Sequence, residues 1–120
     1  MAVITLTTGV SNKGSNGAVN LTRTALTASD TLSYVQGSGQ VLHLYNTTAA
    51  IVTVTLVGTA PTTLSPDGYG GTLSTAGGKA VAVPANGWTV LELDDIWAFL
   101  TGSGTVTVTN GTGVVASLYN

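Results

Sequence analysis

Apolar residues recur at every second position over most of this chain, and the spacing of a helix is hard to find. In the stretch VTVTLV at residues 52–57, for example, Val and Leu alternate with Thr. Such alternation is typical of a strand with one buried face and one polar face, so the pattern predicts an all-β chain. The expected strands are residues 3–8, 19–26, 31–36, 41–46, 51–57, 79–83, 88–94, 105–109 and 114–119.

Stretches rich in Gly, Asn and Pro separate these strands, among them QGSG, SPDGYGG, PANG and TNGTG. In such turns Gly and Asn supply positive φ angles, and Pro fixes the entry to the turn. The loops NTTAA and NGTG are short enough to close hairpins. We therefore expect one hairpin after the strand at 41–46 and another after the strand at 105–109.

Two stretches depart from this alternation of strands and turns. Residues 65–78, SPDGYGGTLSTAGG, are expected to form a long irregular link. The stretch DDIWAFLTG at residues 94–102 is the one place where a short helical turn is expected, with Asp94 or Asp95 as its cap.

Short strands joined by Gly-rich turns predict an antiparallel β-sandwich, jelly-roll-like, with about eight or nine strands. We expect residues 19–120 to form this single domain and residues 1–18 to form an N-terminal strand or arm. In an arm, Val3, Ile4 and Leu6 would contact a neighbouring subunit or partner. The alternative is that the same three residues complete the sheet of their own domain.

Few charges remain to define partners, since charged residues make up 7% of the 120 residues and the net charge is −2. Lys13, Arg23 and Lys79 are far apart in the sequence, so a nucleic-acid partner is not expected. A surface with so few charges is weakly protected against self-association, which predicts that a partner or further copies cover part of it. We find neither a secretory leader pattern nor a membrane-spanning apolar run, and expect synthesis in the cytoplasm.

The chain has one histidine, His43, which lies between Leu42 and Leu44. On a strand it shares a face with Val41 and Tyr45. Catalysis through this imidazole would need an activated nucleophile and an orienting carboxylate, and a metal pair would need a second histidine. Neither pattern is present, so we expect a partly exposed or hydrogen-bonded strand histidine and no catalytic, metal or cofactor residue.

Two other sets of side chains allow functional interpretations. Glu92 and Asp94 stand two positions apart and would share a strand face, but no calcium-loop pattern surrounds them. A solvated strand face or a polar cluster at a subunit interface is the simpler interpretation. Trp88, Trp97 and Tyr69 could stack on sugar rings. That interpretation gives an alternative function, a carbohydrate-binding or receptor-binding β-sandwich of a fibre or spike.

Three segments follow one another in the later part of the chain: YNTTAAIVTVTLVG, GKAVAVPANGWTVLEL and GSGTVTVTNGTGVVASLYN. Their Asn-Thr turn, V-x-V-P-A-x-G edge and terminal G-x-V-x-V hairpin resemble the small capsid decoration, or cement, proteins of tailed bacteriophages. The resemblance extends over residues 41–120. It implies a jelly-roll-like virion protein, without enzymatic activity, that binds the outside of the assembled shell of major capsid protein and stabilises it.

The same resemblance implies a homodimer or homotrimer on the capsid exterior, made in the host cytoplasm, with no cofactor, nucleic acid or membrane partner. The expected capsid or subunit contacts are Val3, Ile4, Leu6, Trp97 and Phe99. Affinity would come from apolar contacts and exposed strand edges rather than from charge.

Overall fold

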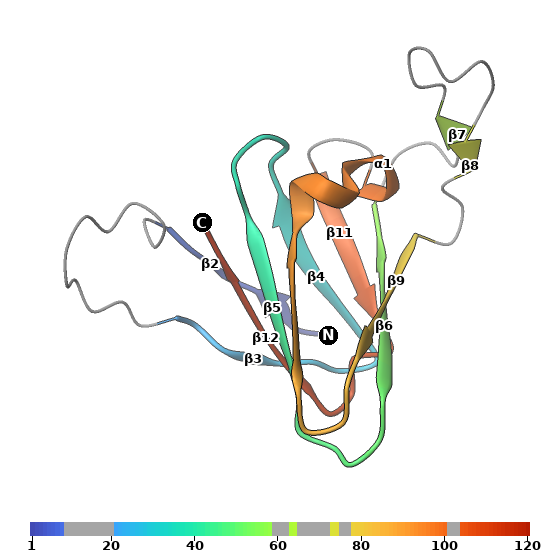
Figure 1. Ribbon diagram of the computed structural model, residues 1–120. Coiled ribbons are helices and arrows are strands. Elements are labelled where there is room, and N and C mark those ends of the chain that lie inside the picture. Colours follow the sequence, from blue (N-terminus) through green and yellow to red (C-terminus); the bar gives the residue numbers. More distant parts are fainter. Residues whose placement is uncertain (9–20, 59–62, 65–72, 75–77, 101–103) are drawn as a thin grey trace.

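A computed structural model of the chain describes residues 1–8, 21–58, 63–64, 73–74, 78–100 and 104–120 (Figure 1). The strands are β1 (Val3–Ile4), β2 (Leu6–Thr7), β3 (Thr24–Ala25), β4 (Ser29–Tyr34), β5 (Val41–Asn46), β6 (Val52–Val57), β7 (Thr63–Leu64), β8 (Leu73–Ser74), β9 (Lys79–Val83), β10 (Trp88–Glu92), β11 (Gly104–Thr109) and β12 (Val114–Tyr119). A 3₁₀ turn, η1 (Leu93–Ile96), and a short helix, α1 (Trp97–Leu100), lie between β10 and β11. The predicted all-β class is confirmed.

Two sheets pack against each other. Sheet 1 has the strand order β1-β4-β11-β6-β9, and sheet 2 has the order β10-β5-β12-β2, with β3 also paired to β12. β7 and β8 form a separate ladder, and β8 lies within the segment expected to be an irregular link. Most of that link falls outside the described residues.

The main strands pair as one long hairpin that is rolled up on itself. β6 pairs with β9, β5 with β10, β4 with β11 and β3 with β12, all antiparallel. The roll closes where β5 pairs with β12 and β6 with β11. This nested order is that of a jelly roll, as predicted. The parallel pairs β1–β4 and β2–β12 make the sheets mixed rather than wholly antiparallel.

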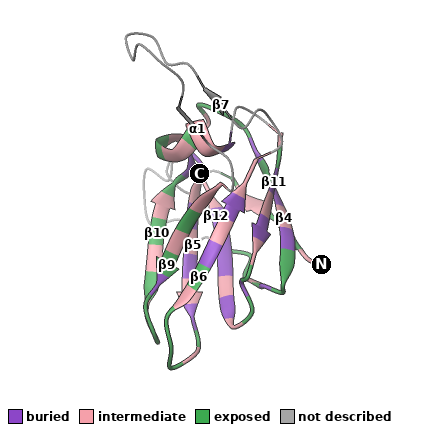
Figure 2. Cartoon of the chain, turned by 90° about the vertical axis from the view of Figure 1, so that its right-hand side faces the viewer, coloured by how far each residue is buried: buried purple, intermediate pink, exposed green. Residues whose placement is uncertain are grey.

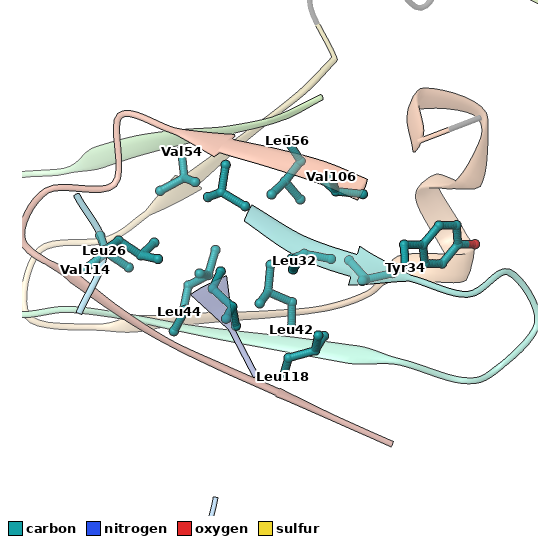
Figure 3. Close-up of a cluster of buried hydrophobic side chains, with 14 of the residues drawn as sticks. Leu26, Leu32, Tyr34, Leu42, Leu44, Val54, Leu56, Val106, Val114 and Leu118 are labelled. Atoms are coloured by element: carbon teal, nitrogen blue, oxygen red, sulfur yellow. The ribbon is translucent and has the colours of Figure 1, made fainter. Parts of the chain in front are cut away.

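The two predicted hairpins are wrong, because each short turn crosses from one sheet to the other. β5 and β6 lie in different sheets, and so do β11 and β12. The reason is burial: Leu42 and Leu44 of β5 cover Val54 and Leu56 of β6 across the core, instead of lying beside them in one sheet (Figure 3). Figure 2 shows the buried residues alternating along the strands with more exposed ones.

One end of the sandwich is covered by η1 and α1, which confirms the predicted helical turn. Leu93 and Leu100 bury their side chains there. Gly58 lets α1 approach β6, since a Cβ at Gly58 would collide with the main chain of Leu100. The predicted cap is wrong: the capping position is Glu92, and no side-chain hydrogen bond caps the turn.

The first residues add a short strand to each sheet. Val3 and Ile4 pair with β4, and Leu6 then pairs with β12 in the opposite sheet. Ile4 is 2% exposed in the core, and Leu6 packs against it, whereas Val3 is 66% exposed. This placement favours a segment that completes its own sheets. Residues 9–18 of the predicted arm lie outside the described residues.

At the other end of the sandwich, the buried amide of Asn46 ties the two sheets together. Its Nδ2 donates to the carbonyl of Ala50 at 2.7 Å and to that of Val83, in sheet 1, at 3.1 Å. Its Oδ1 accepts from both the backbone N–H and the hydroxyl of Thr48. All the hydrogen-bonding capacity of the amide nitrogen is used, which a buried polar group requires.

Three crossing turns meet around Asn46, and they come from the three segments that carry the family resemblance. The N–H of Asn86, a residue with a positive φ of 52°, donates to the carbonyl of Thr48. The N–H and hydroxyl of Thr47 both donate to the carbonyl of Gly113. The turns lie together opposite α1 (Figure 1). The turn motifs of these three segments therefore have a role in folding of the chain.

We expect Asn46→Ala to lower the free energy of unfolding by about 2–4 kcal/mol, because it removes the hydrogen bonds of the buried Val83 carbonyl and of two partly buried backbone groups. Urea denaturation followed by circular dichroism measures the change. Asn120→Ala is the matched control, since the Asn120 amide makes one long contact, 3.4 Å, to Ser38. Equal stability losses in the two variants would contradict the role assigned to Asn46.

Candidate functional site

The outer face of sheet 1 carries mostly small side chains. They come from four strands and are Ser29, Thr31, Ser33, Thr53, Thr55, Ala80, Ala82, Thr105, Thr107 and Thr109. Two valines share this face, Val3 opposite Thr31 and Val57 opposite Thr107, and Val3 is 66% exposed. The register sets Ser29 beside Thr109, and Thr109 beside Thr55. Ser and Thr are under-represented among residues that dominate binding energies. This face is neutral and offers little specific affinity.

The outer face of sheet 2 is different, because aromatic and branched side chains gather on it. We call this surface the aromatic face and define it by Val41, His43, Tyr45, Trp88, Val90 and Tyr119. The ladders align Trp88 with Tyr45, Val90 with His43, and Val41 with Tyr119. Glu92, opposite Val41, lies at its rim. Tyr and Trp are the residue types enriched in binding hot spots.

Trp88 is the most exposed side chain of the aromatic face and lies on its edge strand, β10. Its indole packs against the edge of the His43 ring, with centroids 5.2 Å apart and planes at 64°. The Tyr45 ring lies 5.5 Å away at 58°. Trp88 nevertheless remains 61% exposed, and Val90 beside it 56% exposed. Two neighbouring rings thus support an exposed indole, which is the arrangement of a binding anchor that needs little ordering on contact.

His43 is a half-exposed strand residue, as the sequence predicted. Its neighbours across the two ladders are Val90 and Ser117. In the part of the chain that the structure describes, no three acidic, histidine or cysteine side chains gather to hold a metal ion, and no pocket forms.

The contact residues expected from the sequence are scattered over the fold. Trp97 is 40% exposed on α1, at the opposite end of β10 from Trp88, so the two indoles do not form one platform (Figure 1). Phe99 is half-buried, with the Lys79 ammonium 5.6 Å above its ring. Sequence reasoning missed the cluster around Trp88. The sequence indicates that Tyr45 and His43 share a strand face. Trp88 joins them because β10 pairs with β5, and the sequence does not show this non-local pairing.

Glu92 and Asp94 do not form the pair that their spacing allowed, because β10 ends at Glu92. The carboxylate of Asp94 instead accepts the Tyr34 hydroxyl at 2.6 Å and the N–H groups of Gly37 and Gly39 at 2.8 and 3.1 Å. The hydrogen bond from Tyr34, followed by that from Gly37, lowers the pKa of Asp94 below 3.8. Burial and the same bond raise the pKa of Tyr34, so its hydroxyl stays a donor.

We expect the Asp94 contacts to stabilise the fold at neutral pH and to weaken in acid. The folded-state pKa of Asp94 is lowered, so its contribution is complete above the unfolded value of about 4 and is lost as the pH falls through the folded value. Urea denaturation at pH 7 and pH 3 should therefore show a stability difference between wild type and Asp94→Asn that shrinks in acid. Asp95→Asn, at an exposed neighbouring carboxylate, is the control. A difference that stays constant with pH would contradict this role.

Comparisons with known proteins identify no relative of this chain. No protein-family model, no curated protein and no solved structure matches the chain. Within the described ranges, no helix has the length and apolar character needed to span a membrane. The interpretation of the site therefore depends on its own geometry.

Proposed function

We propose that the chain is a virion structural protein that binds the outer surface of an assembled phage capsid and stabilises it, as a decoration protein does. The observation that carries this proposal is the aromatic face: a preformed, weakly charged surface that includes the exposed Trp88, on a fold whose described part forms no pocket. Such a surface suits a broad protein partner better than a small substrate.

Support also comes from the rigidity of the surface. His43 and Tyr45 lie on β5, which hydrogen-bonds to a neighbouring strand on both sides. The core leucines Leu42 and Leu44 anchor the same strand from behind. The surface is thus held in place before binding, and little conformational entropy is lost on contact.

The mechanism is thermodynamic. A protein that binds the assembled shell of major capsid protein and not its free subunits stabilises the shell by mass action. If each copy touches more than one capsomer, separation of the capsomers must also break those contacts, and many copies act together. No covalent step is required, and the chain acts without enzymatic activity or cofactor on this proposal.

Binding to shells tests the proposal. We expect the purified chain to sediment with expanded shells of the phage that encodes it and to raise their disassembly temperature. Trp88→Ala and Tyr45→Ala should weaken shell binding at least about tenfold, because truncating an aromatic anchor costs more than about 1.4 kcal/mol. Thr107→Ala, on the outer face of sheet 1, should bind as wild type does.

Two outcomes would contradict the proposal. One is absence of the chain from sedimented shells together with an unchanged disassembly temperature. The other is binding that Thr107→Ala abolishes and Trp88→Ala leaves intact.

The second candidate function is carbohydrate binding, and the exposed indole of Trp88 favours it. The rings of His43 and Tyr45 are tilted against Trp88 by 64° and 58°, so the three do not make one flat platform. A single sugar ring could stack on Trp88 alone. Of the other two residues expected to stack on sugars, Trp97 is on a different part of the fold and Tyr69 lies outside the described residues.

A glycan array tests this candidate. If the chain is a carbohydrate-binding module, Trp88→Ala should reduce the signal about tenfold, because one sugar-aromatic contact is lost. Trp97→Ala should leave the signal unchanged, since its ring is not part of the aromatic face. A wild-type chain that gives no glycan-dependent signal would exclude the candidate.

A further inference from the structure

Strand β10 forms one edge of sheet 2. The N–H of Asn46 donates to the carbonyl of Gly87, and the N–H of Leu93 donates to that of Gln40. Because the hydrogen-bonding direction alternates along an antiparallel strand, odd-numbered residues of β10 face β5. The N–H and C=O groups of Trp88, Val90 and Glu92 therefore point away from the sheet.

The other sheet edges are shorter or partly occupied. β1, β2 and β3 are strands of two residues each. β9 carries Lys79, and the hydroxyl of Thr89 donates to its Ala82 carbonyl at 3.0 Å. Short strands and lysines are devices by which proteins prevent their edges from pairing.

β10 has none of these protections. Its sequence, WTVLE, contains neither Pro nor Lys, and its five residues pair with β5 in continuous register without a bulge. Its outward main-chain groups stand beside the exposed side chains of Trp88 and Val90. Such an edge fits one kind of occupant, which is another extended strand.

We propose that this strand is β10 of a second copy of the chain, paired antiparallel about a two-fold axis at Val90. In this register Val90 lies opposite the partner's Val90, and Trp88 lies opposite the partner's Glu92. The charges favour this register. It holds the two Glu92 carboxylates about 13 Å apart, at opposite ends of the pair, whereas a shift that sets Glu92 opposite Glu92 would oppose like charges.

The paired edges join two copies of sheet 2 into one continuous sheet. About six main-chain hydrogen bonds form, and the side chains of Trp88 and Val90 lie on the same surface in both copies. The interface is smaller than the roughly 1,600 Å² of a standard complex, so the free dimer should be weak and depend on concentration. Resting on the proposed function, this dimer would present two aromatic faces side by side, and its affinity for a shell would gain from both.

Disulfide cross-linking tests both the pairing and its register, because the chain contains no cysteine. Residues opposite each other in such a hydrogen-bonded pair have Cα atoms about 5.5 Å apart, within the range of a disulfide. We expect Val90→Cys to cross-link at least about tenfold faster than Thr105→Cys, an exposed residue on the outer face of sheet 1. Trp88→Cys and Glu92→Cys should cross-link slowly alone and rapidly when mixed.

The outcome separates this proposal from the function proposed above. If Val90→Cys cross-links no faster than Thr105→Cys, or if the mixture of Trp88→Cys and Glu92→Cys is as slow as each alone, the pairing is overturned. Shell binding is measured separately, with Tyr45→Ala on the interior strand β5. Rapid register-specific cross-linking without shell binding would support the dimer and reject the decoration function. Shell binding without register-specific cross-linking would support the decoration function and reject the dimer.

Discussion

The fold depends on turns that carry the chain from one sheet to the other, and the Asn46 side chain is the contact that secures them. Its amide joins the end of β5 to the Val83 carbonyl of sheet 1 and closes its own turn through Thr48. Each donor and acceptor of this buried amide needs a hydrogen-bond partner in the folded state, because each unpaired group would cost free energy. The satisfied network therefore fixes which strands face each other. Asp94 has the corresponding role at the opposite end, where it holds the loop between β4 and β5.

These crossing turns explain why aromatic side chains gather on one outer surface and mostly small side chains on the other. Once β5 and β10 are neighbours in sheet 2, Tyr45, His43 and Trp88 come together on its outer side. The same roll places alternating threonines such as Thr107 and Thr55 on the outside of sheet 1. The sandwich thus has one outer surface with clustered rings and one with mostly small side chains. The proposed function and the proposed pairing both use the first.

Most of the strands were predictable because their signal is local. The alternation of Val52, Val54 and Leu56 marks β6 whatever its partners are. The partners were not predictable, because a turn of four or five residues can close a hairpin or cross a sandwich. Here the choice depends on which buried faces cover each other. Asp94 was misread for a similar reason, since its donors include Tyr34, far away in sequence.

The candidate site was partly visible in the sequence. His43 was correctly placed on a strand face with Tyr45. Trp88 was grouped with Trp97, but β10 ends at Glu92 and Trp97 lies on the following helix, so the two indoles are on different parts of the fold. Ile4 was expected as a possible contact, and its burial came from parallel pairing of β1 with β4, which short-range patterns do not show.

On the proposed function, the aromatic face is the surface that meets the shell. An electron cryomicroscopy reconstruction of decorated shells, at a resolution that shows side chains, would locate this contact. We expect density of the major capsid protein against Trp88, Tyr45 and His43. Capsid density against the threonines of sheet 1, with Trp88 facing solvent, would contradict it.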